Sequence, residues 1–296
     1  MSSALYQPAR PPNEEGWSVT IDPVSAAWTY SSLRVASISR GGSLTFHTRD
    51  SEWIVLPLAG SFVVTCGNQR FELEGRDSVF SRVTDFCYVP REQEITIGSV
   101  LGGRVALPGA RAGRTLPARY GAAEDVPVEI RGAGPASRQA NNFASPDGFE
   151  TDRLVSVEVL TPGGNWSSYP PHKHDQSRPG EAVLEEIYYF EVNGGATAGD
   201  PGPGGYQRVY SRDPARPIDV LAEVSSGDTI LIPHGYHGPT MASPNYDLYF
   251  LNVLAGPALT RTMAFCDDPE HAWIRSSWAE MTVDPRLPMT SSKGVV

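Results

Sequence analysis

The sequence has few of the residues and patterns that mark specialised classes of protein. Its 296 residues include three cysteines, Cys66, Cys87 and Cys266, whose wide spacing matches neither a metal-binding motif nor a disulfide framework. We therefore expect reduced thiols in a cytoplasmic protein. No run approaches the roughly 20 apolar residues of a membrane helix, and the first residues lack the apolar core of a secretory signal. A membrane partner is not expected.

Positive charge is also scarce. The 24 lysines and arginines are outnumbered by 34 acidic residues, which gives a formal net charge of −10. This balance excludes nucleic acid as a partner, because binding it requires a basic face that displaces counterions. An anionic ligand would have to be drawn in by a local positive site.

Helical periodicity is weak, whereas strand and turn signals are frequent. The chain has 29 glycines and 26 prolines, which separate short runs of β-branched and aromatic residues. In the first half we predict strands at 33–40, 42–48, 52–66, 69–75, 78–90 and 94–99. In the second half we predict them at 153–162, 184–192, 206–211, 218–224, 228–233 and 246–256. The sequence therefore predicts an all-β protein.

The two halves repeat a similar order of strands, so we predict two copies of one all-β unit, each closed as a jelly roll. Residues 1–110 form the predicted first barrel and residues 151–296 the second. The intervening residues 111–150 are rich in Ala, Gly, Pro and Arg, and we predict a connecting segment with one or two strands, one of them at 128–130. Helix-like spacing at 268–281 predicts a short helix near the end.

Chemically, the most informative stretch is "YPPHKHD" at 169–175. His172 and His174 are two residues apart, so on a strand both imidazoles point to the same face. Glu186 follows at the head of a strongly β run, and the turn in "GDTILIPHGYH" delivers His237 onto another strand. Three imidazoles and one carboxylate predict one divalent metal ion, with zinc first and Mn, Fe, Ni and Co as alternatives.

Two residues compete for places in this ligand set. Glu185 adjoins Glu186, and only one of them can face the site; Glu186 is preferred because it shares its parity with Tyr188 and Phe190. His234 lies inside the turn before His237, where a solvent-facing position is expected.

These motifs resemble the cupin signature, H-x-H…E followed by G-x₅-P-x-G-x-H, although the spacing from His174 to Glu186 is longer than usual. Together, "SSYPPHKHD", "LEEIYYF", "RGAGPASRQANNF" and "IPHGYHGP" resemble the 5-deoxy-glucuronate isomerases of bacterial myo-inositol catabolism. The 4-deoxy-5-hexosulose-uronate ketol-isomerases are a sister family with the same ligand set. The resemblance implies a bicupin with its metal in the second barrel. The first half has His47 but no H-x-H.

The resemblance also implies a reaction, the aldose–ketose isomerisation of 5-deoxy-D-glucuronate to 2-deoxy-5-keto-D-gluconate through an enediol. Arg138 and Arg131 are predicted to bind the carboxylate of this sugar acid, because arginine grips carboxylates bidentately. Glu185, Lys173 and Tyr188 are the catalytic candidates.

Several points stay open at this level. Asp175 and a metal-bound hydroxide are further candidates for the proton-shuttling base. Lys173 has the opposite strand parity to the two histidines. Competing functions are isomerisation of 4-deoxy-5-hexosulose-uronate, an iron-dependent cupin dioxygenase, and a sugar-acid-binding cupin without turnover. A homo-oligomer formed through edge strands is compatible with the sequence.

Overall fold

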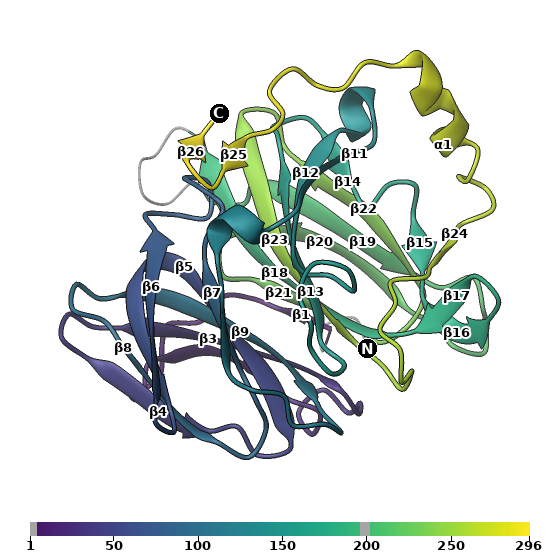
Figure 1. Cartoon of the computed structure of the whole chain (residues 1–296). Helices are drawn as coiled ribbons and strands as arrows, with labels where there is room; N and C mark the ends of the chain where they lie inside the picture. The colour runs from purple at the N-terminus through teal and green to yellow at the C-terminus, as the bar shows by residue number, and fades with distance from the viewer. Residues whose placement is uncertain (1–4, 196–201) are drawn as a thin grey trace.

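Strands dominate the computed structural model, which describes residues 5–195 and 202–296. Figure 1 shows the first half, in purple and blue, beside the second half, in teal to yellow. The first half forms a nine-stranded sheet, and the second half forms a seven-stranded and a six-stranded sheet. The predicted all-β class is confirmed.

The nine-stranded sheet has the order β10-β7-β5-β9-β3-β2, with β4, β6 and β8 attached beside β5. Its strands are β2 (Trp17–Ile21), β3 (Ser31–Ile38), β4 (Ser43–His47), β5 (Ser51–Cys66), β6 (Gln69–Arg76), β7 (Phe86–Val89), β8 (Glu94–Gly98), β9 (Gly103–Arg111) and β10 (Arg119–Gly121). The long strand β5 takes part in both halves of this curved sheet, because it pairs with β7 and β9 at one end and with β6 and β8 at the other.

The second half is a sandwich of two sheets. The seven-stranded sheet contains, in order, β1 (Tyr6–Gln7), β21 (Thr229–Ile232), β18 (Glu185–Gly194), β23 (Tyr246–Ala255), β13 (Val155–Thr161), β12 (Arg138–Ala144) and β11 (Val128–Arg131). The six-stranded sheet contains β20 (Asp219–Val224), β19 (Gly205–Tyr210), β22 (Tyr236–Ala242), β15 (His172–Lys173) and β24 (Cys266–Asp267), with β14 (Trp166–Ser167) beside β22.

The remaining elements are short. Two ribbons are formed by β16 (Asp175–Arg178) with β17 (Glu181–Val183) and by β25 (Thr290–Ser291) with β26 (Gly294–Val295). The helical elements are η2 (Ala123–Asp125), η3 (Gly134–Ala136), α1 (Ile274–Ser277) and η4 (Trp278–Glu280). The consecutive α1 and η4 occupy the segment for which a short helix is predicted near the end.

The same strand order recurs in both halves. The order β7-β5-β9-β3-β2 corresponds to β21-β18-β23-β13-β12, and the strands follow each other along the chain in the same sequence. The first strand of each unit pairs with a strand of the other unit: β1 pairs with β21, and β10 pairs with β7. The two barrels are therefore two copies of one unit that exchange their leading strands.

This correspondence bears on the predicted boundaries at 110 and 150, which stay a prediction. The strand predicted at 128–130 is β11, and the polar stretch that follows it is β12. Both strands pair within the seven-stranded sheet. Their pairing indicates that the second unit begins inside residues 111–150.

The alternating side chains of β18 connect the two barrels. Ile187 and Tyr189 lie in an apolar cluster shared with Leu33, Ile54 and other residues of the first barrel. Tyr188 and Phe190 point the other way, into the core of the second barrel. Burying each such side chain contributes about 1.5–3 kcal/mol. One strand thus fixes the joint between the barrels with one face and lines the inside of the second barrel with the other.

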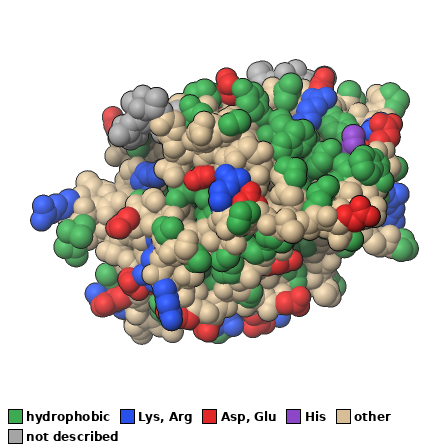
Figure 2. Space-filling model, turned by 90° about the horizontal axis from the view of Figure 1, so that it is seen from above, with side chains coloured by type: hydrophobic (Ala, Val, Ile, Leu, Met, Phe, Trp, Pro, Cys, Tyr) green, Lys and Arg blue, Asp and Glu red, His purple; other side chains and the backbone are tan. Residues whose placement is uncertain are grey.

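None of the helices in the described part of the chain is long and apolar enough to span a membrane. Figure 2 looks onto the side that carries α1 in Figure 1, and it shows hydrophobic side chains gathered around a histidine. Acidic and basic side chains are interspersed over this face, so the net negative charge does not form one acidic surface there.

Candidate metal centre and pocket

Three of the four predicted ligands meet inside the second barrel. The Nε2 atom of His174 lies 2.8 Å from Oε2 of Glu186, and Nε2 of His237 lies 2.9 Å from the same oxygen. All three residues are buried, and their ligand atoms lie within 4.8 Å of one another. The packing of the two sheets explains the meeting, because Glu186 is on the inward face of β18 while His237 is the second residue of β22 in the opposite sheet.

The fourth predicted ligand, His172, lies beside this group. It pairs with His237 across β15 and β22, and their ring centroids are 4.4 Å apart. The ring of His174 is 6.4 Å away, and His172 is outside the 4.8 Å group. His234 is not part of the cluster, since its Nε2 faces the backbone oxygen of Arg216 at 3.2 Å.

The three imidazole rings have a common orientation. In His172, His174 and His237, Nδ1 lies 3.4, 3.2 and 3.4 Å from a backbone carbonyl oxygen. In the tautomer that carries its proton on Nδ1, this atom donates to the carbonyl and the lone pair of Nε2 is free, as in metal-binding histidines. The Nε2 atom of His237 is fully buried and, although it lies 2.9 Å from Glu186 Oε2, it forms no hydrogen bond within the described residues. This donor set fits a divalent transition metal ion.

The charges within the cluster favour an ionised carboxylate. Burial alone would raise the pKa of Glu186, but His237 and His174 outweigh burial and lower it. Burial likewise opposes charge on His174, but Glu186 raises the pKa of this histidine. Burial, followed by repulsion from His237, lowers the pKa of His172 well below its usual value. His172 therefore keeps a neutral ring, the form that binds metal.

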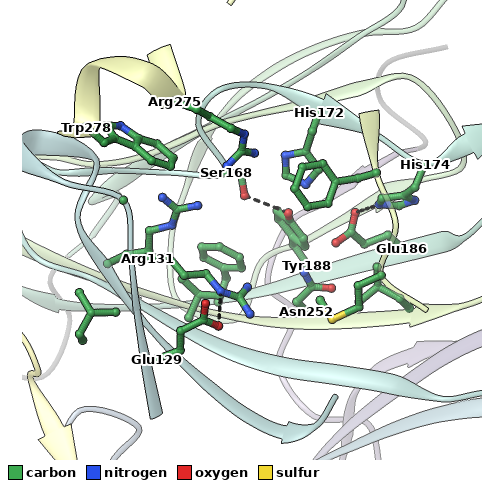
Figure 3. A pocket seen from close by; sticks show the side chains of 18 residues that line it. Glu129, Arg131, Ser168, His172, His174, Glu186, Tyr188, Asn252, Arg275 and Trp278 are labelled. Carbon is green, nitrogen blue, oxygen red and sulfur yellow. Dashed lines mark hydrogen bonds and ion pairs between the residues drawn. The ribbon is translucent and has the colours of Figure 1, made fainter. Parts of the chain in front are cut away.

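The cluster opens into a cavity of about 460 Å³. Figure 3 shows His174 and Glu186 on one side of it, Glu129 and Arg131 on the other, and Tyr188 between them. The Tyr188 hydroxyl is hydrogen-bonded to Ser168 Oγ at 3.0 Å. Oδ1 of Asn252 is buried against the pocket and has no hydrogen-bond partner in the part of the chain that the structure describes. Arg138 and Arg131, the two arginines predicted to bind substrate, both line the cavity.

Glu185 lies outside this pocket, which corrects its prediction as a catalytic residue. Its carboxylate accepts hydrogen bonds from the backbone N–H groups of Thr29, Tyr30 and Ser31, at 2.7, 2.7 and 2.9 Å. Adjacent residues of a strand face opposite sides, so placing Glu186 in the pocket turns Glu185 toward the first barrel. Its role is to hold the two barrels together.

Lys173 is also corrected as a catalytic candidate. Its ammonium lies 2.5 Å from Asp175 Oδ1 and 2.7 Å from Glu181 Oε1, on the side of β15 away from the cavity. Burial lowers the pKa of Lys173, but hydrogen bonds to both carboxylates outweigh it and raise the pKa. The lysine therefore stays protonated, and Asp175 is engaged in the same ion pair.

Ser168, Asn252, Arg275 and Trp278 are among the pocket-lining residues that sequence reasoning missed. Asn252 carried a usable signal, because it is a polar residue within the apolar run of β23. Arg275 and Trp278 carried none, since their predicted short helix gave no reason to place them near the histidines. They reach the pocket through the tertiary course of the C-terminal segment.

A model described as the KduI/IolB family matches residues 5–274 of the chain. The chain belongs to this family. The 5-deoxy-glucuronate isomerase of Geobacillus kaustophilus is 41% identical over 279 residues, covering 93% of this chain and 96% of the relative. That of Bacillus subtilis strain 168 is 39% identical over 250 residues, 83% of this chain and 88% of the relative. The predicted resemblance is confirmed, and this KduI/IolB family member is an isomerase.

Solved structures agree with this assignment. An IolB-like protein from Salmonella typhimurium has a TM-score of 0.82 and 32% identity, covering 91% of this chain and 98% of that one. An oxalate decarboxylase of Lactobacillus farciminis has a TM-score of 0.59 at 12% identity, over 86% and 87% of the two chains, which shows a shared fold alone. The predicted bicupin fold is confirmed.

Proposed function

We propose that this family member is a metal-dependent aldose–ketose isomerase that converts 5-deoxy-D-glucuronate to 2-deoxy-5-keto-D-gluconate in inositol catabolism. The observation that carries the proposal is the common orientation of three neighbouring imidazoles, two of them buried against Glu186, at the wall of a cavity with arginines on its other side. The names of the relatives at 34–41% identity support the choice of substrate.

His172, His174, Glu186 and His237 are the proposed ligands of one divalent ion, with zinc first. Such an ion would act as a Lewis acid that polarises the carbonyl of the substrate and stabilises negative charge on its oxygens. Arg138 and Arg131 are proposed to bind the carboxylate, which aligns the sugar chain across the cavity. The polar groups along that path are those of Tyr188, Ser168 and Asn252.

Isomerisation moves a proton between two neighbouring carbons and shifts protons on their oxygens. Tyr188 is the remaining catalytic candidate of the three predicted from sequence. Its hydroxyl lies in the cavity, bonded to Ser168, so it can donate a proton to a substrate oxygen or hold it there. The free Oδ1 of Asn252 can accept a hydrogen bond from a substrate hydroxyl and so orient the chain.

The function is tested by metal analysis of the purified protein, followed by an anaerobic assay with 5-deoxy-D-glucuronate in D₂O, observed by NMR. We expect conversion without oxygen, its loss on chelation, and its return on addition of a divalent ion. Deuterium in the product would support the enediol route. A metal-loaded protein that consumes oxygen instead would favour a dioxygenase. If the protein turned over only 4-deoxy-5-hexosulose-uronate, this other deoxy-uronate would be assigned as its substrate.

The role of Tyr188 makes a separate prediction. Tyr188→Phe is expected to lower kcat roughly 100-fold, in the range of a lost general acid, while metal content stays unchanged. Tyr189→Phe is the matched control, because the neighbouring hydroxyl faces the other way and binds Glu191 at 2.5 Å. Equal kcat values for the two variants would remove Tyr188 from the mechanism.

A further inference from the structure

The cavity is lined by three arginines, and two of them already have a carboxylate partner. Arg131 donates from Nε to Glu129 Oε2 at 2.8 Å. Arg275 donates two hydrogen bonds to the carboxylate of Asp267, from Nε at 2.5 Å and from Nη2 at 2.8 Å. Arg138 forms no ion pair within the described residues, and its one protein hydrogen bond there runs from Nη1 to a backbone oxygen at 3.0 Å. One positive charge in the pocket is therefore unmatched.

Arg138 is also the most enclosed of the three, with 9% of its surface exposed. Its guanidinium carbon lies 5.8 Å from the centre of the Trp278 ring, and that of Arg275 lies 5.3 Å from the same ring. Burial, then repulsion from Arg131 and Arg275, lowers the pKa of Arg138 to about 10, so it stays charged at neutral pH. Burying an unpaired charge is costly, which indicates that a ligand supplies the counter-charge.

The backbone leaves room for this guanidinium at one glycine. A Cβ atom on Gly132 would lie 2.7 Å from Nη1 of Arg138 and 2.2 Å from the carbonyl oxygen of Ala136. The φ angle of +75° at Gly132 is also one that other residues rarely adopt. The chain thus holds Arg138 between a glycine turn on one side and Trp278 on the other.

We propose that Arg138 selects substrates by their charge: it admits sugar acids with one carboxylate and excludes neutral sugars and sugar phosphates. This proposal rests on the proposed function and selects Arg138 over Arg131 as the main carboxylate-binding residue. A single carboxylate matches the single unpaired guanidinium, which can bind it through two parallel N–H groups. A phosphate group carries up to two negative charges, and the second finds no free cation because Arg131 and Arg275 are already matched.

The test uses ligands that cannot isomerise, so it does not depend on turnover. D-Gluconate, D-glucitol and D-glucitol 6-phosphate share a six-carbon polyol chain and differ in charge. Each is titrated calorimetrically into the metal-loaded wild type and into Arg138→Gln and Arg138→Lys. We expect the wild type to bind gluconate at least tenfold more tightly than the other two. Arg138→Gln should weaken gluconate binding roughly 10- to 100-fold, with Arg138→Lys in between.

Arg34→Gln is the matched control. Arg34 also forms no ion pair within the described residues, but it lies in the first barrel and stacks on Trp53, with its guanidinium carbon 5.2 Å from the ring centre. Its substitution should leave gluconate affinity unchanged. If Arg138→Gln fails to fold, the proposal is still tested by Arg138→Lys and by the binding of the three ligands to the wild type.

Wild type that binds gluconate no better than glucitol 6-phosphate, or Arg138→Gln that binds gluconate as well as the wild type, would overturn the proposal. A failure of the proposed function would be distinguishable from a failure of this proposal. Arg138-dependent gluconate binding without turnover of 5-deoxy-D-glucuronate would leave the charge selection standing and remove the reaction. Where turnover is present, Arg138→Gln should raise KM more than it lowers kcat.

Discussion

The two barrels begin their central strands in the same way. Glu52 stands at the head of β5 and Glu185 at the head of β18. Glu52 accepts hydrogen bonds from the backbone N–H groups of residues 152–154 at 2.7–2.8 Å, and Glu185 accepts them from residues 29–31 at 2.7–2.9 Å. Each carboxylate thus holds the segment that leads into the other barrel's β3 or β13. The duplicated unit is joined by two reciprocal contacts of the same kind.

The residue that follows this glutamate differs between the two barrels. After Glu52 comes Trp53, which is 4% exposed and fills the interior of the first barrel. Its ring lies edge-on to Phe46 at 5.8 Å and beneath the guanidinium of Arg34 at 5.2 Å. After Glu185 comes Glu186, at the centre of the histidine cluster. Equivalent inward positions thus hold an aromatic core in one copy and a candidate metal centre in the other.

The largest expected effect comes from breaking the site in the second barrel. Glu186→Gln should abolish metal binding and lower kcat/KM on the order of a thousandfold, since a lost Lewis acid costs several kcal/mol of transition-state stabilisation. Elemental analysis and the NMR assay measure the two effects. Glu185→Gln is the control and should keep its metal. Full metal content in Glu186→Gln would refute the ligand assignment.

The corresponding change in the first barrel should affect stability only. Trp53→Ala is expected to cost about 3–5 kcal/mol, the range for removing a large aromatic side chain from a core. The measurements are the free energy of unfolding in urea and the metal content of the folded protein. We expect a lower midpoint with unchanged metal content. Metal loss under native conditions would show that the barrels depend on each other more closely than their separate cores indicate.

The smallest effects should come from the two contacts that join the barrels. Glu52 is fully buried and also accepts a hydrogen bond from Tyr88 at 2.9 Å, whereas Glu185 is half-buried. We expect Glu52→Gln to cost about 3 kcal/mol and Glu185→Gln about 1 kcal/mol, because buried charge-assisted hydrogen bonds contribute most. Urea denaturation of both variants measures the difference. Equal losses would contradict the burial argument.

Strand prediction succeeded for β5 and β18, whose side chains alternate or are β-branched, although it missed the alternating strand β2. It also failed where a strand is polar or rich in small residues. β12 reads as a polar connection, yet all seven residues are buried. Its polar side chains are satisfied from distant segments: Gln139 donates to the backbone oxygen of Thr290 at 2.9 Å, and Asn141 donates to Glu158 at 3.1 Å. β9 was missed for a similar reason, since glycine and proline interrupt its pattern.

The sequence by itself determined the strand parity that puts Glu186, Tyr188 and Phe190 on one face, and it determined the residue types of the candidate ligand set. These depend on local geometry, because a strand alternates with a fixed period of two. Tertiary structure alone decided that Glu185 joins the barrels, that Lys173 is neutralised by Glu181, and that Arg275 and Trp278 reach the pocket. Such roles depend on partners distant in the chain, which no local pattern encodes.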